Sequence, residues 1–131
     1  MGELGYAAIL CILMLGGETE VTHAYSAAYD VHRIRTDCET SDQVIEVGMD
    51  KRSSLDSLQQ VLFAAEITQK SPKIVMIDTD GRFGPYETRV STAARRAGVD
   101  FEIIPKDALI RWQMTSWLRS YDAASVALSG S

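Results

Sequence analysis

The chain has 131 residues, of which 46% are hydrophobic and 24% are charged, and its formal net charge at pH 7 is −5. This length fits one domain, and this composition excludes disordered, collagen-like and disulfide-scaffold proteins. The negative charge excludes a protein that is basic over its whole surface, so a nucleic-acid-binding role has to come from a local site. We predict a single domain over residues 1–122 and a frayed C-terminal tail over residues 123–131.

The first predicted element is the apolar segment from Tyr6 to Leu15. It is shorter than the about 20 residues that cross a bilayer, so we predict no membrane association. Gly16 and Gly17 follow it, as is typical of a buried helix that ends at glycine, and this interpretation corresponds to a cytoplasmic protein. The alternative is a signal peptide, with export after cleavage near Ala24, because the segment also has the length of a signal-peptide core.

The rest of the chain alternates between strand and helix patterns. Period-two alternation and apolar runs predict strands, and apolar residues at helical spacing predict helices. The predicted strands cover residues 18–23, 29–38, 43–49, 73–78 and 99–104, with a weakly structured connection over residues 24–28, and the predicted helices after the first cover residues 53–69, 86–97 and 107–120. The predicted fold class is α/β, with a mixed central sheet that begins as an antiparallel meander and is flanked by helices.

The second and third predicted strands carry two acidic residues. Asp37 lies near the end of one strand and Glu46 lies within the next. Turn-forming residues between the strands predict an antiparallel hairpin, which can bring the two carboxylates together. The apolar face of the third strand is expected to pack on the helix over residues 53–69, through Ile45, Val47 and Met49 on the strand and Leu55, Leu58 and Leu62 on the helix.

Two convergent carboxylates at the rim of a sheet form a hard-oxygen site suited to Mg²⁺ or Mn²⁺, ions that bridge to phosphate oxygens. Lys51 follows Glu46 closely and can place an ammonium group beside the metal, where it offsets phosphate charge or orients a water molecule. The pattern predicts hydrolysis of phosphodiester bonds in nucleic acid.

Part of the chain resembles the PD-(D/E)XK superfamily of restriction-endonuclease-like nucleases. The resemblance lies in the segments Arg35-Thr-Asp37-Cys-Glu-Thr40, Val44-Ile-Glu46-Val and Asp50-Lys51, followed by a helix with Gln60 and Phe63. The resemblance covers about residues 3 to 78 and includes the order of elements: an opening helix, a meander with the acids, a crossover helix and a further strand. It implies a restriction-endonuclease-like fold and a magnesium-dependent nuclease, with DNA as the expected nucleic-acid partner.

The resemblance also implies individual roles. Asp37 and Glu46 correspond to the metal carboxylates, and the carbonyl oxygen of Val47 is a possible third ligand. Lys51 corresponds to the basic catalytic residue, although the superfamily has its lysine at the position of Gly48, so Lys51 has to act from a displaced position.

Supporting roles follow from the same resemblance. Gln60 and Arg35 correspond to residues that hold the site or bind the nucleic-acid backbone. Glu3 or Glu20 is a possible additional acid. Each residue also has an ordinary structural interpretation, because an Asp at the end of a strand often shapes a turn and single Glu and Lys residues often lie on surfaces.

Two other functions stay open. The glycine at position 48 is compatible with a nuclease-like fold that has lost catalysis and binds DNA or protein. The segment Ile74-Val-Met-Ile-Asp78-Thr-Asp80-Gly81 resembles the first motif of haloacid-dehalogenase-like phosphatases, which implies a nucleophile at Asp78 and an acid or base at Asp80. Turn formation by Asp-Thr-Asp-Gly is the better explanation of that segment. The two cysteines, Cys11 and Cys38, form no CxxC pair for metal or redox chemistry.

Overall fold

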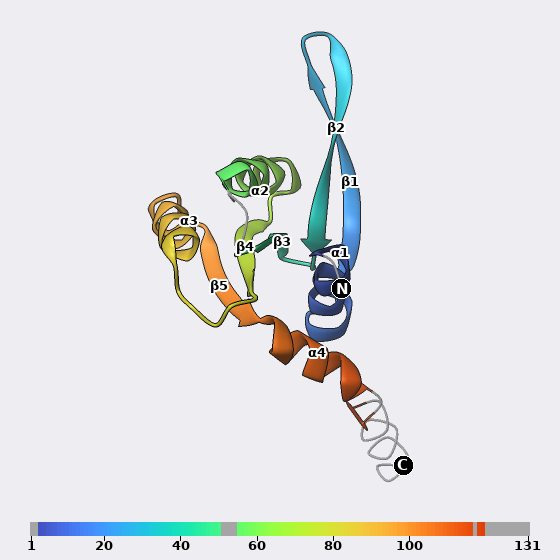
Figure 1. Ribbon diagram of the computed structural model, residues 1–131. Coiled ribbons are helices and arrows are strands. Elements are labelled where there is room, and N and C mark those ends of the chain that lie inside the picture. Colours follow the sequence, from blue (N-terminus) through green and yellow to red (C-terminus); the bar gives the residue numbers. More distant parts are fainter. Residues whose placement is uncertain (1–2, 51–54, 117, 120–131) are drawn as a thin grey trace, which may run out of the picture.

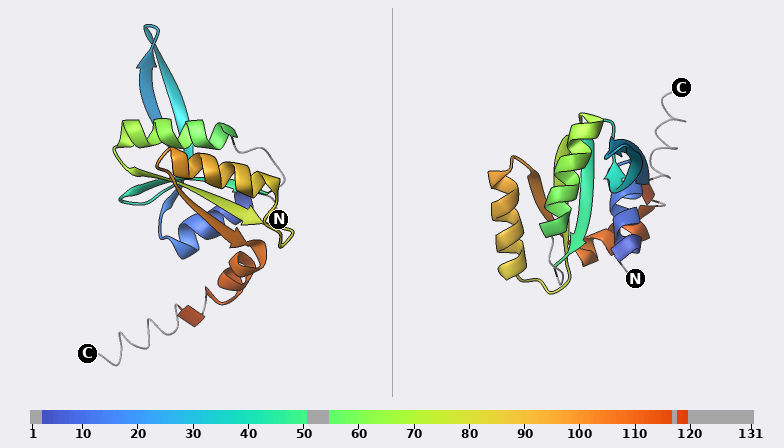
Figure 2. Two further views of the ribbon diagram at one scale, coloured as in Figure 1. Left: turned by 90° about the vertical axis from the view of Figure 1, so that its left-hand side faces the viewer. Right: turned by 90° about the horizontal axis from the view of Figure 1, so that it is seen from above.

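The computed structural model describes residues 3–50, 55–116 and 118–119, which form an α/β fold with helices on both faces of one sheet (Figures 1 and 2). The elements in chain order are α1 Glu3–Ala8, the π-helical segment η1 Ile9–Met14, β1 Glu18–Ala27, β2 Asp30–Glu39, β3 Gln43–Met49, α2 Leu55–Thr68, β4 Ser71–Asp78, α3 Pro85–Arg96, β5 Asp100–Pro105 and α4 Lys106–Met114. Lys51, the predicted helix start at residue 53 and the predicted tail lie outside the described residues.

The five strands lie side by side in the order β1-β2-β3-β4-β5. β1, β2 and β3 are antiparallel neighbours, whereas β3, β4 and β5 run parallel. The change occurs at β3 because a short turn joins β2 to β3, while α2 and α3 carry the chain back over the sheet before β4 and β5. The predicted mixed α/β sheet that begins with an antiparallel meander is therefore confirmed.

Two apolar layers lie on opposite faces of the sheet. On one face α1, η1 and α4 cover Ile45, Val47, Val75 and Ile77, together with Leu10 and Leu109. On the other face α2 and α3 cover Val44, Ile74 and Met76, together with Val61, Ala64 and Val90. Successive strand residues alternate between the two layers, which is why the β4 run of apolar residues is buried throughout.

The expected packing of β3 on α2 is wrong in its choice of face. Ile45 and Val47 are buried, and Met49 packs with them, against the N-terminal helix and not against α2. Leu58 of α2 packs instead on the layer that contains Val44, and Leu62 is exposed. The alternation along β3 is as predicted, but sequence periodicity defines two faces without saying which helix covers each.

The N-terminal apolar segment is helical and ends at glycine, as predicted. Ile9 and Leu10 are buried, but Ile12 and Leu13 are 53% and 39% exposed, so the expectation that all four are buried is wrong. A helix that packs on one side of a sheet turns part of even an apolar segment toward solvent. Among the described residues, no helix is long and apolar enough to cross a membrane.

A disulfide bond between Cys11 and Cys38 joins η1 to β2. The two cysteines are 27 positions apart and both are fully buried. Gly17 lies at the same junction, where a Cβ atom would stand 2.6 Å from the carbonyl oxygen of Glu39, so a larger residue cannot fit. The bond thus holds the N-terminal helix against the strand that carries Asp37.

The β1–β2 pair is longer than expected and forms a twisted ribbon that projects beyond the body of the protein (Figure 1). The segment over residues 24–28, predicted to be a weakly structured connection, is the end of β1 and part of its turn. Pairing of Ala27 with Asp30 leaves Ala28 and Tyr29 as the loop, with φ of 52° and 66°. Neither residue is typical of such a turn, which is why the sequence did not indicate it.

Replacing Cys11 with serine is expected to lower the free energy of unfolding by about 3 kcal/mol, because the bond restricts the unfolded chain. Urea denaturation in oxidising buffer measures the difference, and wild-type protein treated with a thiol reductant should approach the stability of the variant. Equal urea midpoints for wild type and variant in oxidising buffer would contradict this prediction.

Candidate functional site

Strand pairing is interrupted on both sides of Asp37. The β2–β3 ladder pairs Glu39 with Val44 and Cys38 with Ile45 and goes no further toward Asp37. In place of a backbone partner on β2, the Oδ2 atom of Asp37 accepts a hydrogen bond from the backbone N–H of Val47. The distance between the Val47 nitrogen and this oxygen is 2.8 Å. The side chain of Asp37 is therefore directed toward β3, at the place where β2 separates from it.

The β1–β2 ladder is irregular at the same level. It pairs Thr19 with Cys38 and Val21 with Thr36, but the intervening Glu20 and Asp37 are not paired. Glu20 has a φ of 54°, a left-handed conformation that non-glycine residues rarely adopt. Such irregularities in strands re-aim side chains and are common next to functional sites.

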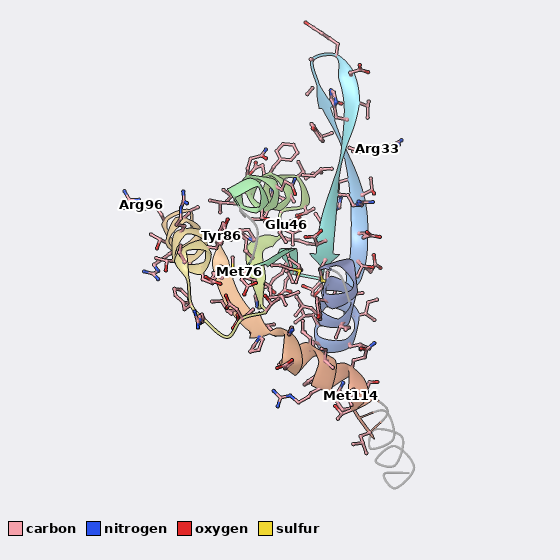
Figure 3. The ribbon with its side chains drawn as sticks, in the orientation of Figure 1. Arg33, Glu46, Met76, Tyr86, Arg96 and Met114 are labelled. Carbon is pink, nitrogen blue, oxygen red and sulfur yellow. A yellow bond between two sulfur atoms is a disulfide. The ribbon has the colours of Figure 1, made fainter. Side chains whose placement is uncertain are left out.

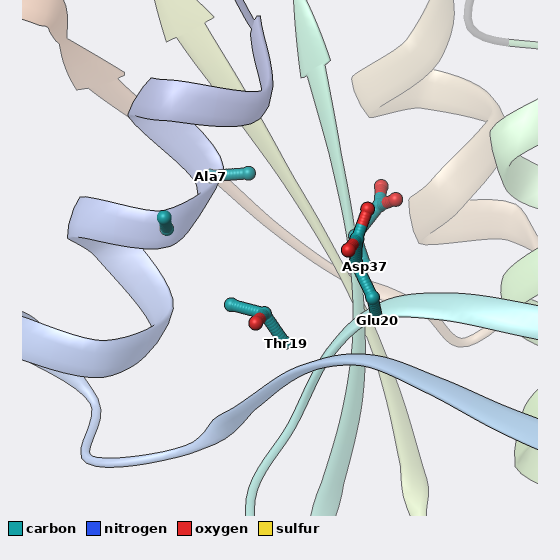
Figure 4. A pocket seen from close by; sticks show the side chains of 5 residues that line it. Ala7, Thr19, Glu20 and Asp37 are labelled. Atoms are coloured by element: carbon teal, nitrogen blue, oxygen red, sulfur yellow. The ribbon is translucent and has the colours of Figure 1, made fainter.

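A pocket of about 140 Å³ lies over this irregular point, between α1 and the start of the ribbon. Ala7 and Ala8 of α1 line it together with Thr19, Glu20 and Asp37. Figure 4 shows the carboxylates of Glu20 and Asp37 on the same side of the pocket, with the smaller side chains of Ala7 and Thr19 opposite them. The two carboxylates come from neighbouring strands and share one small opening.

Glu46 lies on β3, one residue before the amide that Asp37 binds. Its side chain is on the face of β3 that also carries Val44 (Figure 3), and the residue is only 4% exposed. The N–H and C=O of one strand residue point to the same neighbouring strand, so the carbonyl of Val47 also points toward β2. The Val47 backbone therefore lies next to Asp37, whereas the Glu46 side chain lies on the α2 face of the sheet and does not line the Asp37 pocket, which is on the α1 face.

The remaining predicted site residues are more distant from this point or are not described. Arg35 is exposed on β2 opposite Thr22. Gln60 is exposed on α2, and Phe63 of the same helix packs edge-on against Tyr25 of β1, with ring centroids 4.8 Å apart. Lys51 lies outside the described residues.

A second acidic cluster lies at the carboxyl ends of the parallel strands β3 and β4. Its four carboxylates each offer an oxygen atom, and these atoms lie within 4.8 Å of one another; the residues are Asp50, Asp78, Asp80 and Glu87. Asp50 follows β3 directly, and Asp78 ends β4. They meet because the carboxyl ends of parallel neighbours share an edge.

Hydrogen bonds within this second cluster account for much of its geometry. Asp50 is 5% exposed and accepts bonds from the N–H and hydroxyl of Thr79, at 2.8 and 2.7 Å. Asp78 accepts bonds from the backbone N–H groups of Asp80 and Gly81. Glu87 accepts one from the N–H of Gly84 at the start of α3. Asp78 therefore shapes the turn after β4, as the simpler interpretation of Asp-Thr-Asp-Gly predicts.

The pKa values of Asp50 and Asp78 shift in opposite directions. Burial alone raises the pKa of Asp50, but the hydrogen bonds from Thr79 outweigh burial and hold that pKa below its usual range. Burial raises the pKa of Asp78, the bonds from Asp80 and Gly81 oppose this, and the nearby carboxyl groups of Asp50 and Asp80 help to keep the pKa above its usual range. As pH rises, Asp50 therefore loses its proton before Asp78 does.

A third polar group surrounds the buried Glu39 at the end of β2. Its carboxylate contacts the imidazole of His23 and accepts bonds from the hydroxyl of Thr36 at 2.7 Å and the ammonium of Lys70 at 3.1 Å. Burial favours the neutral acid, but the bonds from these three groups outweigh it and lower the pKa of Glu39. A pocket of about 410 Å³ lies beside this group.

Sequence reasoning missed two of these features. Asp50 and Asp78 each come at the end of a predicted strand, and two successive parallel strands would have indicated that the two residues meet. No comparable signal exists for Glu39, because His23 and Lys70 lie 16 and 31 positions away in the chain.

Comparison with protein-family models, with curated proteins and with solved structures finds no match to this chain.

Replacing Glu39 with glutamine should lower the melting temperature at about pH 7, because Lys70 and His23 lose their charged acceptor at a cost of about 2 kcal/mol. A lowered pKa in the folded protein stabilises it above the pKa of the unfolded chain, and this stabilisation disappears as pH falls through the folded-state pKa. The difference between variant and wild type should therefore shrink as pH falls below 4.5 and through the lowered folded-state pKa.

Thermal denaturation across this pH range checks the prediction, with replacement of the exposed Glu66 by glutamine as the matched control. A difference that stays constant over the whole range would contradict a stabilising role for the charged carboxylate.

Proposed function

We propose that this chain is a metal-dependent nuclease of the restriction-endonuclease-like type, which hydrolyses phosphodiester bonds in DNA. The observation that carries the proposal is the double interruption of strand pairing at Asp37, where the carboxylate binds the Val47 amide and shares a pocket with Glu20. The order of helix, antiparallel meander, crossover helix and parallel strand supports it as well, because the resemblance of residues 3–78 implies this order.

The groups at this point fit a divalent metal ion. A carboxylate offers about four acceptor positions, and the bond from Val47 occupies one of those on Asp37. Glu20 supplies a further exposed carboxylate in the same pocket, and carboxylate and carbonyl oxygens are the ligands that Mg²⁺ and Mn²⁺ prefer. We propose Asp37, Glu46 and the Val47 carbonyl as the metal ligands, with Glu20 as an additional acid; Glu46 would have to reach the ion from the α2 face of β3, whereas Asp37 and Glu20 meet it from the α1 side.

Each residue has a specific task in this proposal. A bound ion supplies an activated water molecule and neutralises charge on the phosphate. Asp37 fixes the ion at the rim, because the hydrogen bond from Val47 holds its carboxylate in one orientation. Lys51 is proposed to offset charge on the phosphate. Arg35 and Gln60 are exposed and are proposed to hold the nucleic-acid backbone.

The alternative phosphatase function depends on Asp78 and Asp80. The four acidic residues at that edge favour it as a second candidate, since they can also hold a metal ion. A nucleophilic role for Asp78 is less well supported, because one of its oxygen atoms already binds two backbone N–H groups of its own turn. The third candidate, a nuclease-like fold without catalysis, draws its support from Gly48.

Replacing Asp37 with asparagine or Glu46 with glutamine should reduce magnesium-dependent DNA cleavage by about 100-fold or more, because each change removes a charged metal ligand. A gel assay with supercoiled plasmid and linear DNA in Mg²⁺ or Mn²⁺ measures the loss. The control is Asp80→Asn, which removes an acid from the other cluster and should leave cleavage unchanged.

The outcomes separate the three candidates. Loss of activity in Asp80→Asn alone, with hydrolysis of a phosphate monoester by the wild type, would favour the phosphatase. Wild-type protein that binds DNA but cleaves none in either metal would favour the fold without catalysis.

Mn²⁺ is expected to raise the melting temperature of the wild-type protein, since an ion that binds only the folded state stabilises it by about 2.7 kcal/mol at 100 times its Kd. Differential scanning fluorimetry with and without Mn²⁺ measures this shift. The double variant Asp37→Asn, Glu46→Gln should lose it, whereas Asp78→Asn, Asp80→Asn should keep it. The reverse result would place the ion at the second cluster and contradict the assigned ligands.

A further inference from the structure

The β1–β2 ribbon has one face toward α2 and one face away from it. On the face toward α2, Tyr25 stacks on His32 with ring centroids 5.6 Å apart and contacts Phe63 of α2. Directly opposed residues share a face, and successive residues alternate. The outer face therefore carries the three pairs Thr22 with Arg35, Ala24 with Arg33, and Ser26 with Val31.

This outer face is positively charged in a negatively charged protein. Its two arginines are exposed, and the residues opposite them, Thr22 and Ala24, are small and neutral. None of its six residues is acidic. In Figure 3 the side chain of Arg33 extends from the ribbon into solvent on the side away from α2. A chain with a net charge of −5 thus presents its ribbon as a local site for an anionic partner.

The outer face continues into the proposed catalytic site. Arg33 and Arg35 precede Asp37 on the same strand by about 13 and about 7 Å. The pocket that contains Asp37 is lined by Ala7 and Ala8 of α1, and α1 covers the face of the sheet opposite α2. The two arginines and the Asp37 pocket therefore lie on the same side of the protein, in one line along β2.

The tip of the ribbon is strained and exposes an aromatic side chain. Ala28 and Tyr29 both have positive φ, as a two-residue type I′ turn requires, although Asn-Gly is the sequence such a turn favours. Tyr29 is fully exposed, and Val31 beside it is 67% exposed. A solvent-exposed apolar tip on an unfavourable turn points to a contact with a partner.

We propose that the β1–β2 ribbon is a DNA-binding arm that enters the major groove of duplex DNA, with Arg33 and Arg35 on the groove and its phosphates and Tyr29 at the tip. The major groove of B-form DNA is about 12 Å wide and admits a two-stranded ribbon, whereas the deep, narrow major groove of duplex RNA does not. The inference rests on the proposed function, for which it names duplex DNA as the substrate class.

Binding is tested with the full chain and a fluorescent DNA duplex of about 20 base pairs, two helical turns. Fluorescence anisotropy is measured in EDTA, so that neither metal binding nor hydrolysis contributes. Arg33→Ala, Arg35→Ala should weaken binding about tenfold or more and should lower the slope of log K against log salt by about 2, since each lost phosphate contact lowers it by about 0.9.

The matched control is Arg89→Ala, Arg96→Ala, which changes the net charge equally on exposed residues of α3. Arg96 points away from the ribbon on the far side of the protein (Figure 3). This variant should bind DNA as the wild type does. Equal weakening by both double variants would indicate an effect of net charge alone and would overturn the proposal.

A second variant tests the tip. Ala28→Asn, Tyr29→Gly introduces the favourable turn sequence, so it should raise the melting temperature and at the same time weaken DNA binding. Unchanged DNA binding by this more stable variant would overturn the role of Tyr29.

Three further results would overturn the arm itself. The first is equal affinity for duplex RNA of the same sequence, and the second is equal affinity for single-stranded DNA. The third is a change of oligomeric state, measured by light scattering, in ribbon variants that bind DNA as the wild type does. That result would identify a second copy of the chain as the partner. Arginine-dependent binding with an inactive wild type would leave the arm supported and remove only the catalytic proposal.

Discussion

The hydrogen bond between the Asp37 carboxylate and the Val47 amide is the interaction on which the candidate site depends. It replaces a backbone bond at the point where β2 leaves β3, so the amide stays paired although the strands separate. The irregular pairing at Glu20 then opens the other side of β2. An acidic side chain is thereby held in one orientation at the end of a pocket, which a regular ladder does not allow.

The rest of the fold holds this point in place. The disulfide between Cys11 and Cys38 binds the N-terminal helix to the residue next to Asp37, and Ala7 and Ala8 of α1 line the pocket. Two apolar layers, one on each face of the sheet, fix the parallel strands, and the second group of acids lies at the carboxyl ends of β3 and β4. The two groups of acids therefore share β3, with the Asp37 pocket on its β2 side and the second cluster on its β4 side.

The ribbon extends the same strand beyond the body of the protein. Because β2 carries Asp37 at its base and Arg33 and Arg35 further out, one strand joins a proposed catalytic group to a proposed binding surface. The network around Glu39 secures the base of this strand, through His23 on β1 and Lys70 before β4. Glu39, which stabilises the base of the ribbon, and Asp37, which lies in the candidate site, are thus close neighbours on β2.

The sequence by itself determined the mixed α/β fold, the antiparallel order of the first three strands, and the helical N-terminus, because periodicity and turn residues are local properties. It did not determine that Ile45 and Val47 face the N-terminal helix, since periodicity does not say which helix covers a face. The sequence did not predict the full length of the ribbon, because Ala28 and Tyr29 are not residues that favour a tight turn. The Cys11–Cys38 bond, the acids around Asp50 and the partners of Glu39 required the tertiary structure, since each joins residues that only the folded sheet brings together.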